Sequence, residues 1–94
     1  MLIDVIDVRV MDDYQLDLRF EDGVQGVVDV ADLVAFTGVF APLRSHDYFR
    51  RVRVDAELGT ICWPNGADLD PDVLYSLVTG EPILLAEPEA LLVA

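Results

Sequence analysis

Three aspartates, Asp68, Asp70 and Asp72, have the spacing of the first, third and fifth ligands of a calcium-binding loop, whose hard oxygen atoms converge on one ion. The rest of that loop is missing. If Asp68 is the first ligand, Val73 stands where a glycine must make the sharp turn, and Thr79 stands where a bidentate glutamate is needed. The motif therefore disfavours calcium binding.

The start of a helix explains the same residues better. Asp70 can accept hydrogen bonds from free backbone N–H groups, Pro71 suits the first helical position, and Asp72 complements the positive end of the helix dipole. The predicted helix covers residues 71–79 and ends before Gly80, where a left-handed residue is favoured. Its predicted apolar face consists of Val73, Leu74, Leu77 and Val78.

The turn before this helix is a candidate site. Asn65 and Gly66 form a turn signal, and Asp68 is the carboxylate that the start of a helix explains least. An aromatic ring, an amide and carboxylates come together in this block, as polar and aromatic groups do in small-ligand pockets. The candidate ligand or partner contacts are Trp63, Asn65, Asp68 and Asp70.

Four of the six arginines lie within ten residues of one another, at Arg44, Arg50, Arg51 and Arg53. Such a cluster can bind a carboxylate or a phosphate, or it can balance nearby aspartates. We favour the second role and keep Arg50, Arg51 and Arg53 as candidate partner contacts.

The chain offers few parts for catalysis. His46 is the only histidine and Cys62 the only cysteine, so a triad would have to combine His46 with Cys62 or with a serine. Paired carboxylates would need a pocket with unlike environments that separate their pKa values. We therefore predict that the protein is not an enzyme and that it needs no cofactor or metal.

The charge balance favours a protein partner. The chain has 18 acidic residues against six arginines and no lysine, which gives a formal net charge of -12. This field repels nucleic acid and attracts a basic protein. Solubility alone is the alternative explanation of the charge.

The targeting signals point to the cytoplasm. The N-terminus has aspartates where a secretory signal needs a basic start and an unbroken apolar run. The longest apolar stretch, residues 33–43, is too short and too interrupted to span a membrane. A single cysteine permits no intramolecular disulfide, which fits a reducing compartment. We predict a cytoplasmic protein without membrane contacts.

Alternating apolar residues in the N-terminal third predict a meander of three antiparallel strands. A turn at Gly23 joins the second strand to the third. Aligning the buried faces predicts the pairs Val10–Leu16, Val8–Leu18, Ile6–Phe20 and Leu16–Val28.

Charge supports this register. It places Arg9 opposite Asp17 and Asp7 opposite Arg19 on the outer face, although only apolar residues were used to set it. Near the start, Val5 falls on the opposite face from Ile6 and Val8, so a bulge or a frayed strand end is expected there.

A second hairpin is predicted across the turn at residues 56–59, with Val54 facing Ile61 and Val52 facing Trp63. Between the hairpins, residues 31–36 predict a helical turn that ends at Gly38, and Ser45 or Asp47 can cap another turn. The predicted fold class is α+β, with an antiparallel sheet of about five strands (the three-stranded meander plus the second hairpin), short middle helices and a C-terminal helix near 71–79.

Residues 1–80 are expected to form a single domain, followed by an apolar C-terminal segment at 81–94. This segment is too apolar for an ordinary solvated tail, because it contains Ile83, Leu84, Leu85, Leu91, Leu92 and Val93. It could bind a partner or a second copy of the chain, which would give a homo-oligomer.

Several motifs occur in order along the chain: F-x-D-G at 20–23, V-D-V-A-D-L at 28–33, G-V-F-A-P-L at 38–43, D-Y-F-R-R-V at 47–52 and W-P-N-G-A-D-L-D-P-D-V-L-Y at 63–75. Together they resemble the bacterial family known as domain of unknown function 2442, over about residues 5–76. The resemblance implies a small α+β domain with an antiparallel sheet and no established activity.

The resemblance also bears on partners. Proteins of this family are similar to small standalone proteins that are often encoded beside another small protein, in toxin–antitoxin-like pairs. Some carry an added helix-turn-helix DNA-binding domain. This sequence has no second helical domain after Tyr75, so DNA binding is not carried over.

Two hypotheses about function follow. The first is a non-enzymatic protein-interaction module, the antitoxin-like member of a two-gene pair, that holds a small basic partner through its acidic surface and residues 81–94. The alternative is a small-ligand or metal sensor centred on the turn from Trp63 to Asp70.

Overall fold

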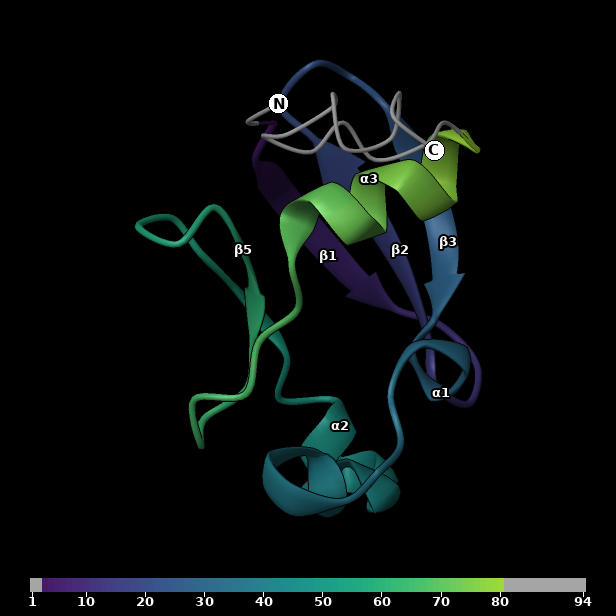
Figure 1. The fold of residues 1–94 in the computed structure, drawn as a ribbon, viewed down its shortest axis with the longest axis vertical. Coiled ribbons are helices and arrows are strands. Elements are labelled where there is room, and N and C mark those ends of the chain that lie inside the picture. Colours follow the sequence, from purple (N-terminus) through teal and green to yellow (C-terminus); the bar gives the residue numbers. More distant parts are fainter. Residues whose placement is uncertain (1–2, 81–94) are drawn as a thin grey trace, which may run out of the picture.

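The computed structural model describes residues 3–80 as an α+β fold, in which helix α3 crosses one face of a three-stranded antiparallel sheet (Figure 1). The predicted fold class is confirmed. Within residues 3–80, no helix is long and apolar enough to cross a membrane. The elements, in chain order, are β1 (Val5–Val10), β2 (Gln15–Phe20), β3 (Gln25–Asp29), α1 (Val30–Leu33), the 3-10 helix η1 (Gly38–Arg44), α2 (His46–Phe49), β4 (Arg53–Asp55), β5 (Thr60–Cys62) and α3 (Pro71–Thr79). Residues 81–94, which were predicted to bind a partner or a second copy of the chain, lie outside the described residues.

The meander has the predicted register over most of its length, since Val8–Leu18, Val10–Leu16 and Leu16–Val28 are all pairs. The predicted pairing of Ile6 with Phe20 is wrong. A bulge between Val5 and Asp7 shifts the register and brings Val5 opposite Phe20. The expected bulge is thus confirmed, and it buries Val5 while Ile6 stays 48% exposed.

The cross-strand charges face one another without forming contact ion pairs. Arg9 lies opposite Asp17 and Asp7 opposite Arg19, as predicted. No N–O distance within 4.0 Å joins these four side chains. Asp17 instead accepts a 3.0 Å hydrogen bond from the Gln25 side-chain amide. The charge pattern therefore agrees with the register but contributes little to stability at this exposed face.

The five strands divide between two sheets, β1–β2–β3 and β4–β5. In the second sheet Val54 faces Ile61, as predicted, and the strands are joined by residues 56–59. Because β4 begins at Arg53, the predicted partners Val52 and Trp63 stand one residue beyond this ladder. The hairpin meets β1 through a 2.9 Å hydrogen bond from the Val5 N–H to the Gly59 carbonyl oxygen.

The middle segment differs from the prediction in the bounds of its first helix and in the role of Gly38. Helix α1 begins one residue earlier than predicted, because Asp29 caps it by accepting a 3.0 Å hydrogen bond from the Ala31 N–H. It ends at Leu33, so the predicted extension to residue 36 is wrong. Gly38 begins η1 and does not end α1. Ser45 caps α2, as one of the two predicted alternatives, by accepting from the Tyr48 N–H.

Helix α3 has the predicted bounds, with Asp70 as its cap, Pro71 in its first turn and Gly80 left-handed at φ 76°. Its predicted apolar face is partly wrong. Leu74 is buried and Val78 packs against the core, but Val73 and Leu77 are exposed. The helix is rotated so that Tyr75 takes a place against the core.

The close approach of α3 to β3 depends on Gly26. This residue lies opposite Leu18 in the ladder, on the face that also carries the buried Leu16 and Phe20. A Cβ atom at Gly26 would lie 2.5 Å from Cγ1 of Val78 and 3.3 Å from its Cβ. Gly26 does not have a positive φ, so the glycine is needed here for space alone.

We predict that Gly26→Ala lowers the free energy of unfolding by about 1–3 kcal/mol, because the β-branched Val78 side chain has little rotamer freedom in a helix to move aside. Urea denaturation of the wild type, Gly26→Ala, Val78→Ala and the double variant measures this. Gly26→Ala should lower the free energy of unfolding by a smaller amount in the Val78→Ala background. Equal costs in both backgrounds would show that the two residues do not meet.

Candidate functional site

Trp63, the first predicted contact, is a core residue. It is 1% exposed, and its indole N–H donates a 3.0 Å hydrogen bond to the Phe49 carbonyl oxygen. The Trp63 and Phe49 ring centres lie 5.9 Å apart. A buried indole usually satisfies its N–H in this way. Trp63 therefore joins the end of β5 to α2, and its ring presents no open surface to a ligand.

Asn65 closes the turn and fastens it to the middle segment. Its Nδ2 donates to the Val39 carbonyl oxygen at 2.8 Å, and its Oδ1 accepts from the Ala67 N–H at 3.1 Å. Its backbone N–H donates to the Tyr48 hydroxyl at 3.0 Å. Gly66, at φ 90°, provides the left-handed residue that the turn needs. The amide predicted as a ligand contact thus holds two distant segments together.

The two candidate aspartates have different surroundings. Asp70 accepts a 2.8 Å hydrogen bond from the Asp72 N–H, which is the predicted capping role. Asp68 is exposed, and only its backbone takes part in structure, through a bridge to Cys62. Within residues 3–80, no three histidine, cysteine or carboxylate side chains converge in a way that could hold a metal ion.

The candidate arginines do not converge on one point. Arg50 forms a 3.2 Å ion pair with Asp47, so it balances an aspartate, as we favoured. The Arg51 guanidinium lies 6.0 Å from the centre of the Tyr48 ring, whereas Arg53 is exposed on β4. Both can still meet a partner, and that remains a prediction.

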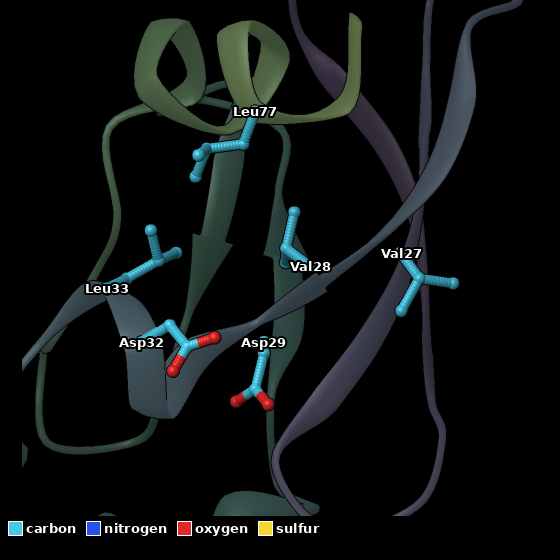
Figure 2. A pocket seen from close by; sticks show the side chains of 6 residues that line it. All are labelled: Val27, Val28, Asp29, Asp32, Leu33 and Leu77. Atoms are coloured by element: carbon cyan, nitrogen blue, oxygen red, sulfur yellow. The ribbon is translucent and has the colours of Figure 1, made fainter. Parts of the chain in front are cut away.

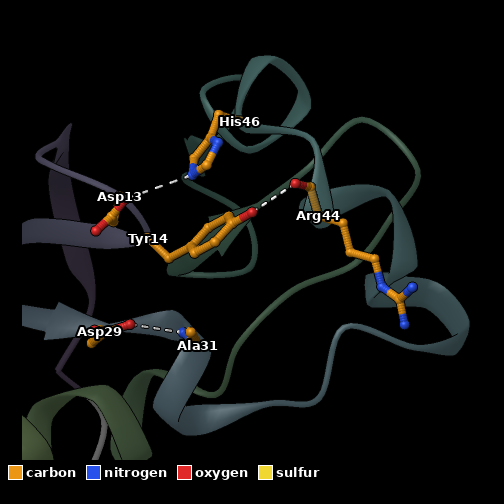
Figure 3. Close-up of polar contacts among 6 residues, drawn as sticks. All are labelled: Asp13, Tyr14, Asp29, Ala31, Arg44 and His46. Atoms are coloured by element: carbon orange, nitrogen blue, oxygen red, sulfur yellow. Dashed lines mark hydrogen bonds and ion pairs between the residues drawn. The ribbon is translucent and has the colours of Figure 1, made fainter.

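A polar cluster that the sequence did not reveal surrounds Tyr14 (Figure 3). The Tyr14 ring stacks on His46 with centres 4.5 Å apart, and its hydroxyl donates to the Arg44 carbonyl oxygen at 2.6 Å. His46 Nε2 lies 3.9 Å from an Asp13 carboxylate oxygen. The cluster ties the β1–β2 turn to the start of α2. No spacing signal could have found it, because its residues lie about 30 positions apart.

Asp22 connects the β2–β3 turn to α3. Its Oδ2 accepts a 2.6 Å hydrogen bond from the Tyr75 hydroxyl, and its Oδ1 accepts from the Val24 N–H at 3.0 Å. These bonds, with that of Tyr75 foremost, lower the pKa of Asp22 below its ordinary value of 3.8. The Tyr75 ring also meets Phe20 edge-on at 5.0 Å. Tyr75 therefore holds α3 against the meander by both its ring and its hydroxyl.

A hollow of about 180 Å³ lies where β3, α1 and α3 meet (Figure 2). Val28, Leu33 and Leu77 form its apolar wall, and Asp29 and Asp32 also line it. The apolar pattern of the sequence did not reveal this hollow, because it placed Leu77 on the buried face of α3. Leu77 is 50% exposed, and Val27 of the same lining is 52% exposed.

Comparison with known proteins gives one match. The family model described as "Protein of unknown function (DUF2442)" matches residues 5–80. No curated protein and no solved structure matches the chain. The matched range begins with β1 and ends with the C-cap of α3, so it contains every element described above.

We predict that Asn65→Ala lowers the free energy of unfolding by about 1 kcal/mol or more, because the Val39 carbonyl and the Ala67 N–H lose their partner. Asp68→Ala is the matched control and should change it by less than about 0.5 kcal/mol. Urea denaturation measures both. If Asp68→Ala were the more damaging change, the structural role of Asn65 would be wrong.

We predict that Tyr75→Phe raises the pKa of Asp22 toward its ordinary value, whereas Tyr14→Phe, which also removes a bonded hydroxyl, does not. Since the folded-state pKa is lowered, this bond stabilises the fold above the unfolded-state pKa and is lost as the pH falls through the folded-state pKa. Carboxyl NMR titration of the wild type and both variants measures it. An unchanged Asp22 pKa in Tyr75→Phe would refute the assignment.

Proposed function

The chain belongs to the DUF2442 family, and we propose that it is a non-enzymatic protein-interaction module that binds a small basic partner. One observation carries the proposal: the acidic charge is displayed on the surface. Thr60 is the only polar or charged residue that is buried within residues 3–80. In the same range, Asp47 is the only carboxylate within 4.0 Å of an arginine, namely Arg50, and Asp13 lies 3.9 Å from the His46 imidazole. Most of the carboxylates are therefore free to attract an external cation.

The uses of the polar side chains support this proposal. Asn65, Tyr14 and Tyr75 each make hydrogen bonds that join segments distant in sequence. Asp70 and Asp29 cap helices. These side chains hold the fold together. An interaction surface made of the exposed carboxylates and apolar side chains does not need them as binding groups.

The partner's chemistry follows from the field of the chain. A formal net charge of -12 repels phosphate backbones and speeds the approach of a basic protein. The finer form of the proposal is that the chain is the antitoxin-like member of a two-gene pair and acts in the cytoplasm. The sensor hypothesis for the turn from Trp63 to Asp70 stays a prediction, and fluorescence of the buried Trp63 against a metal and metabolite panel would test it.

The proposal predicts that the full chain, co-expressed with the product of the neighbouring gene, is purified as a complex. The complex should weaken as salt is raised, because the attraction is between surface charges. Size-exclusion chromatography with light scattering at low and high salt measures this. Two separate proteins at low salt would refute the proposal. A complex whose stability does not change with salt would refute the claim that surface charges hold it together.

A further inference from the structure

Strand β3 has an open edge. It is the last strand of its sheet within the described chain. The Phe20 N–H donates to the Val24 carbonyl, and the Val30 N–H donates to the Tyr14 carbonyl. The backbone N–H and C=O groups of the even-numbered residues in this segment therefore point toward β2. By alternation, the backbone groups of Gln25, Val27 and Asp29 face outward. Within residues 3–80, the outward groups of Gln25 and Val27 pair with no other strand, whereas Asp29 caps the start of α1.

The hollow lies beside this open edge. Val28 points to the inner face of the sheet, where Leu77 of α3 and Leu33 of α1 also line the hollow (Figure 2). A strand added to β3 would place the side chain next to Val28 on that inner face. One apolar side chain of the added strand would therefore enter the hollow and cover the exposed part of Leu77.

Carboxylates outnumber arginines along the same edge, where Arg19 of β2 lies opposite Gln25. Asp29 and Asp32 line the hollow, and Asp17 lies opposite Val27 on the outer face of the sheet. No arginine lines the hollow. The residues of an added strand next to Val27 and Asp29 would have their side chains on the outer face, close to these carboxylates. Cationic side chains fit there, and acidic ones would be repelled.

The negative charge at the edge of β3 favours some of the segments that could pair with it over others. The chain's own segment at 81–94 contains three glutamates and no lysine or arginine. A second copy of the chain also carries a formal charge of -12. Both would bring negative charge to an acidic edge, whereas a basic partner brings the complementary sign.

We propose that the open edge of β3 binds an extended segment of a basic partner as an added antiparallel strand, with one apolar side chain in the hollow and a cationic residue on each side of it. The inference rests on the proposed function, because it names the surface and binding mode of the same interaction. Strand addition of this kind takes affinity from backbone hydrogen bonds and specificity from pockets for alternate side chains.

A labelled synthetic peptide, Lys-Thr-Lys-Leu-Lys-Thr-Lys, is the probe, and fluorescence anisotropy with the full chain measures binding. Replacing its lysines by glutamates, or its leucine by serine, should abolish detectable binding. Backbone methylation separates strand addition from simple charge attraction. The lysines beside the leucine present their amides to β3, so N-methylation there should weaken binding about tenfold or more, whereas N-methylation of the leucine should not.

Variants of the protein give the matched comparison. Leu77→Asp should weaken peptide binding about tenfold, because its carboxylate would be desolvated against the leucine of the peptide in the hollow. Leu58→Asp adds the same charge elsewhere and should not weaken binding. Leu58 is 53% exposed, close to the 50% of Leu77, but lies in the turn between β4 and β5. Asp32→Asn should weaken binding, and Asp68→Asn, at another exposed carboxylate, should not. Both leucines are exposed, so these variants should fold, and circular dichroism checks this.

The same variants in the co-purification separate two kinds of failure. A partner complex lost with Leu77→Asp and kept with Leu58→Asp supports the edge. A complex kept with both leaves the proposed function standing and overturns the edge as its site. Failure to obtain any complex with the wild type overturns the proposed function itself.

Two other outcomes would also overturn the choice of occupant. If the wild type is a dimer by light scattering and Leu77→Asp is a monomer, a second copy occupies the edge. If Leu84→Asp with Leu85→Asp increases peptide affinity, the chain's own segment at 81–94 competes for it. Equal peptide binding by wild type and Leu77→Asp would remove the proposal altogether.

Discussion

The packing of α3 across the meander at Gly26 is the contact on which the rest of the structure depends. The absence of a side chain at Gly26 lets Val78 approach the backbone of β3, which brings Leu74 into the core. Tyr75 then reaches Phe20 with its ring and Asp22 with its hydroxyl. This orientation leaves Leu77 half-exposed beside Val28, so one packing constraint creates both the core and the hollow next to it.

A second set of contacts joins the remaining half of the chain to this unit. The Trp63 indole N–H donates a hydrogen bond to the Phe49 carbonyl. The Asn65 side chain donates to the Val39 carbonyl, and the Asn65 backbone N–H donates to the Tyr48 hydroxyl. Each of these bonds ends on a backbone carbonyl or hydroxyl in the segment between the two hairpins. A segment made of short helical turns cannot be stable through its own local hydrogen bonds, so its position depends on these side chains. The block that is most distinctive in the sequence therefore serves the fold.

The sequence predicted what depends on neighbouring residues. Alternation placed Val8 opposite Leu18, and capping rules placed α3 between Asp70 and Gly80, because strand pairing across short turns and helix ends are local. It could not predict which side of α3 is buried. Val73, Leu74, Leu77 and Val78 are equally apolar, and the rotation of the helix is decided by a glycine about 50 residues earlier and by Tyr75. The hollow and the Tyr14 cluster were missed for the same reason, since both arise only when distant segments meet.

Charge explains how an open strand edge can persist in a small domain. An unpaired edge invites pairing with another copy, and proteins commonly prevent this with short edge strands and charged side chains. β3 is five residues long and ends at Asp29, with Asp32 close by and Asp17 on the adjacent strand. When two copies approach through β3, the negative charge of each edge repels the other copy. The same charge attracts a cationic strand. The feature that keeps copies of the chain apart is therefore also one that selects a basic partner, and a single charge distribution meets both requirements.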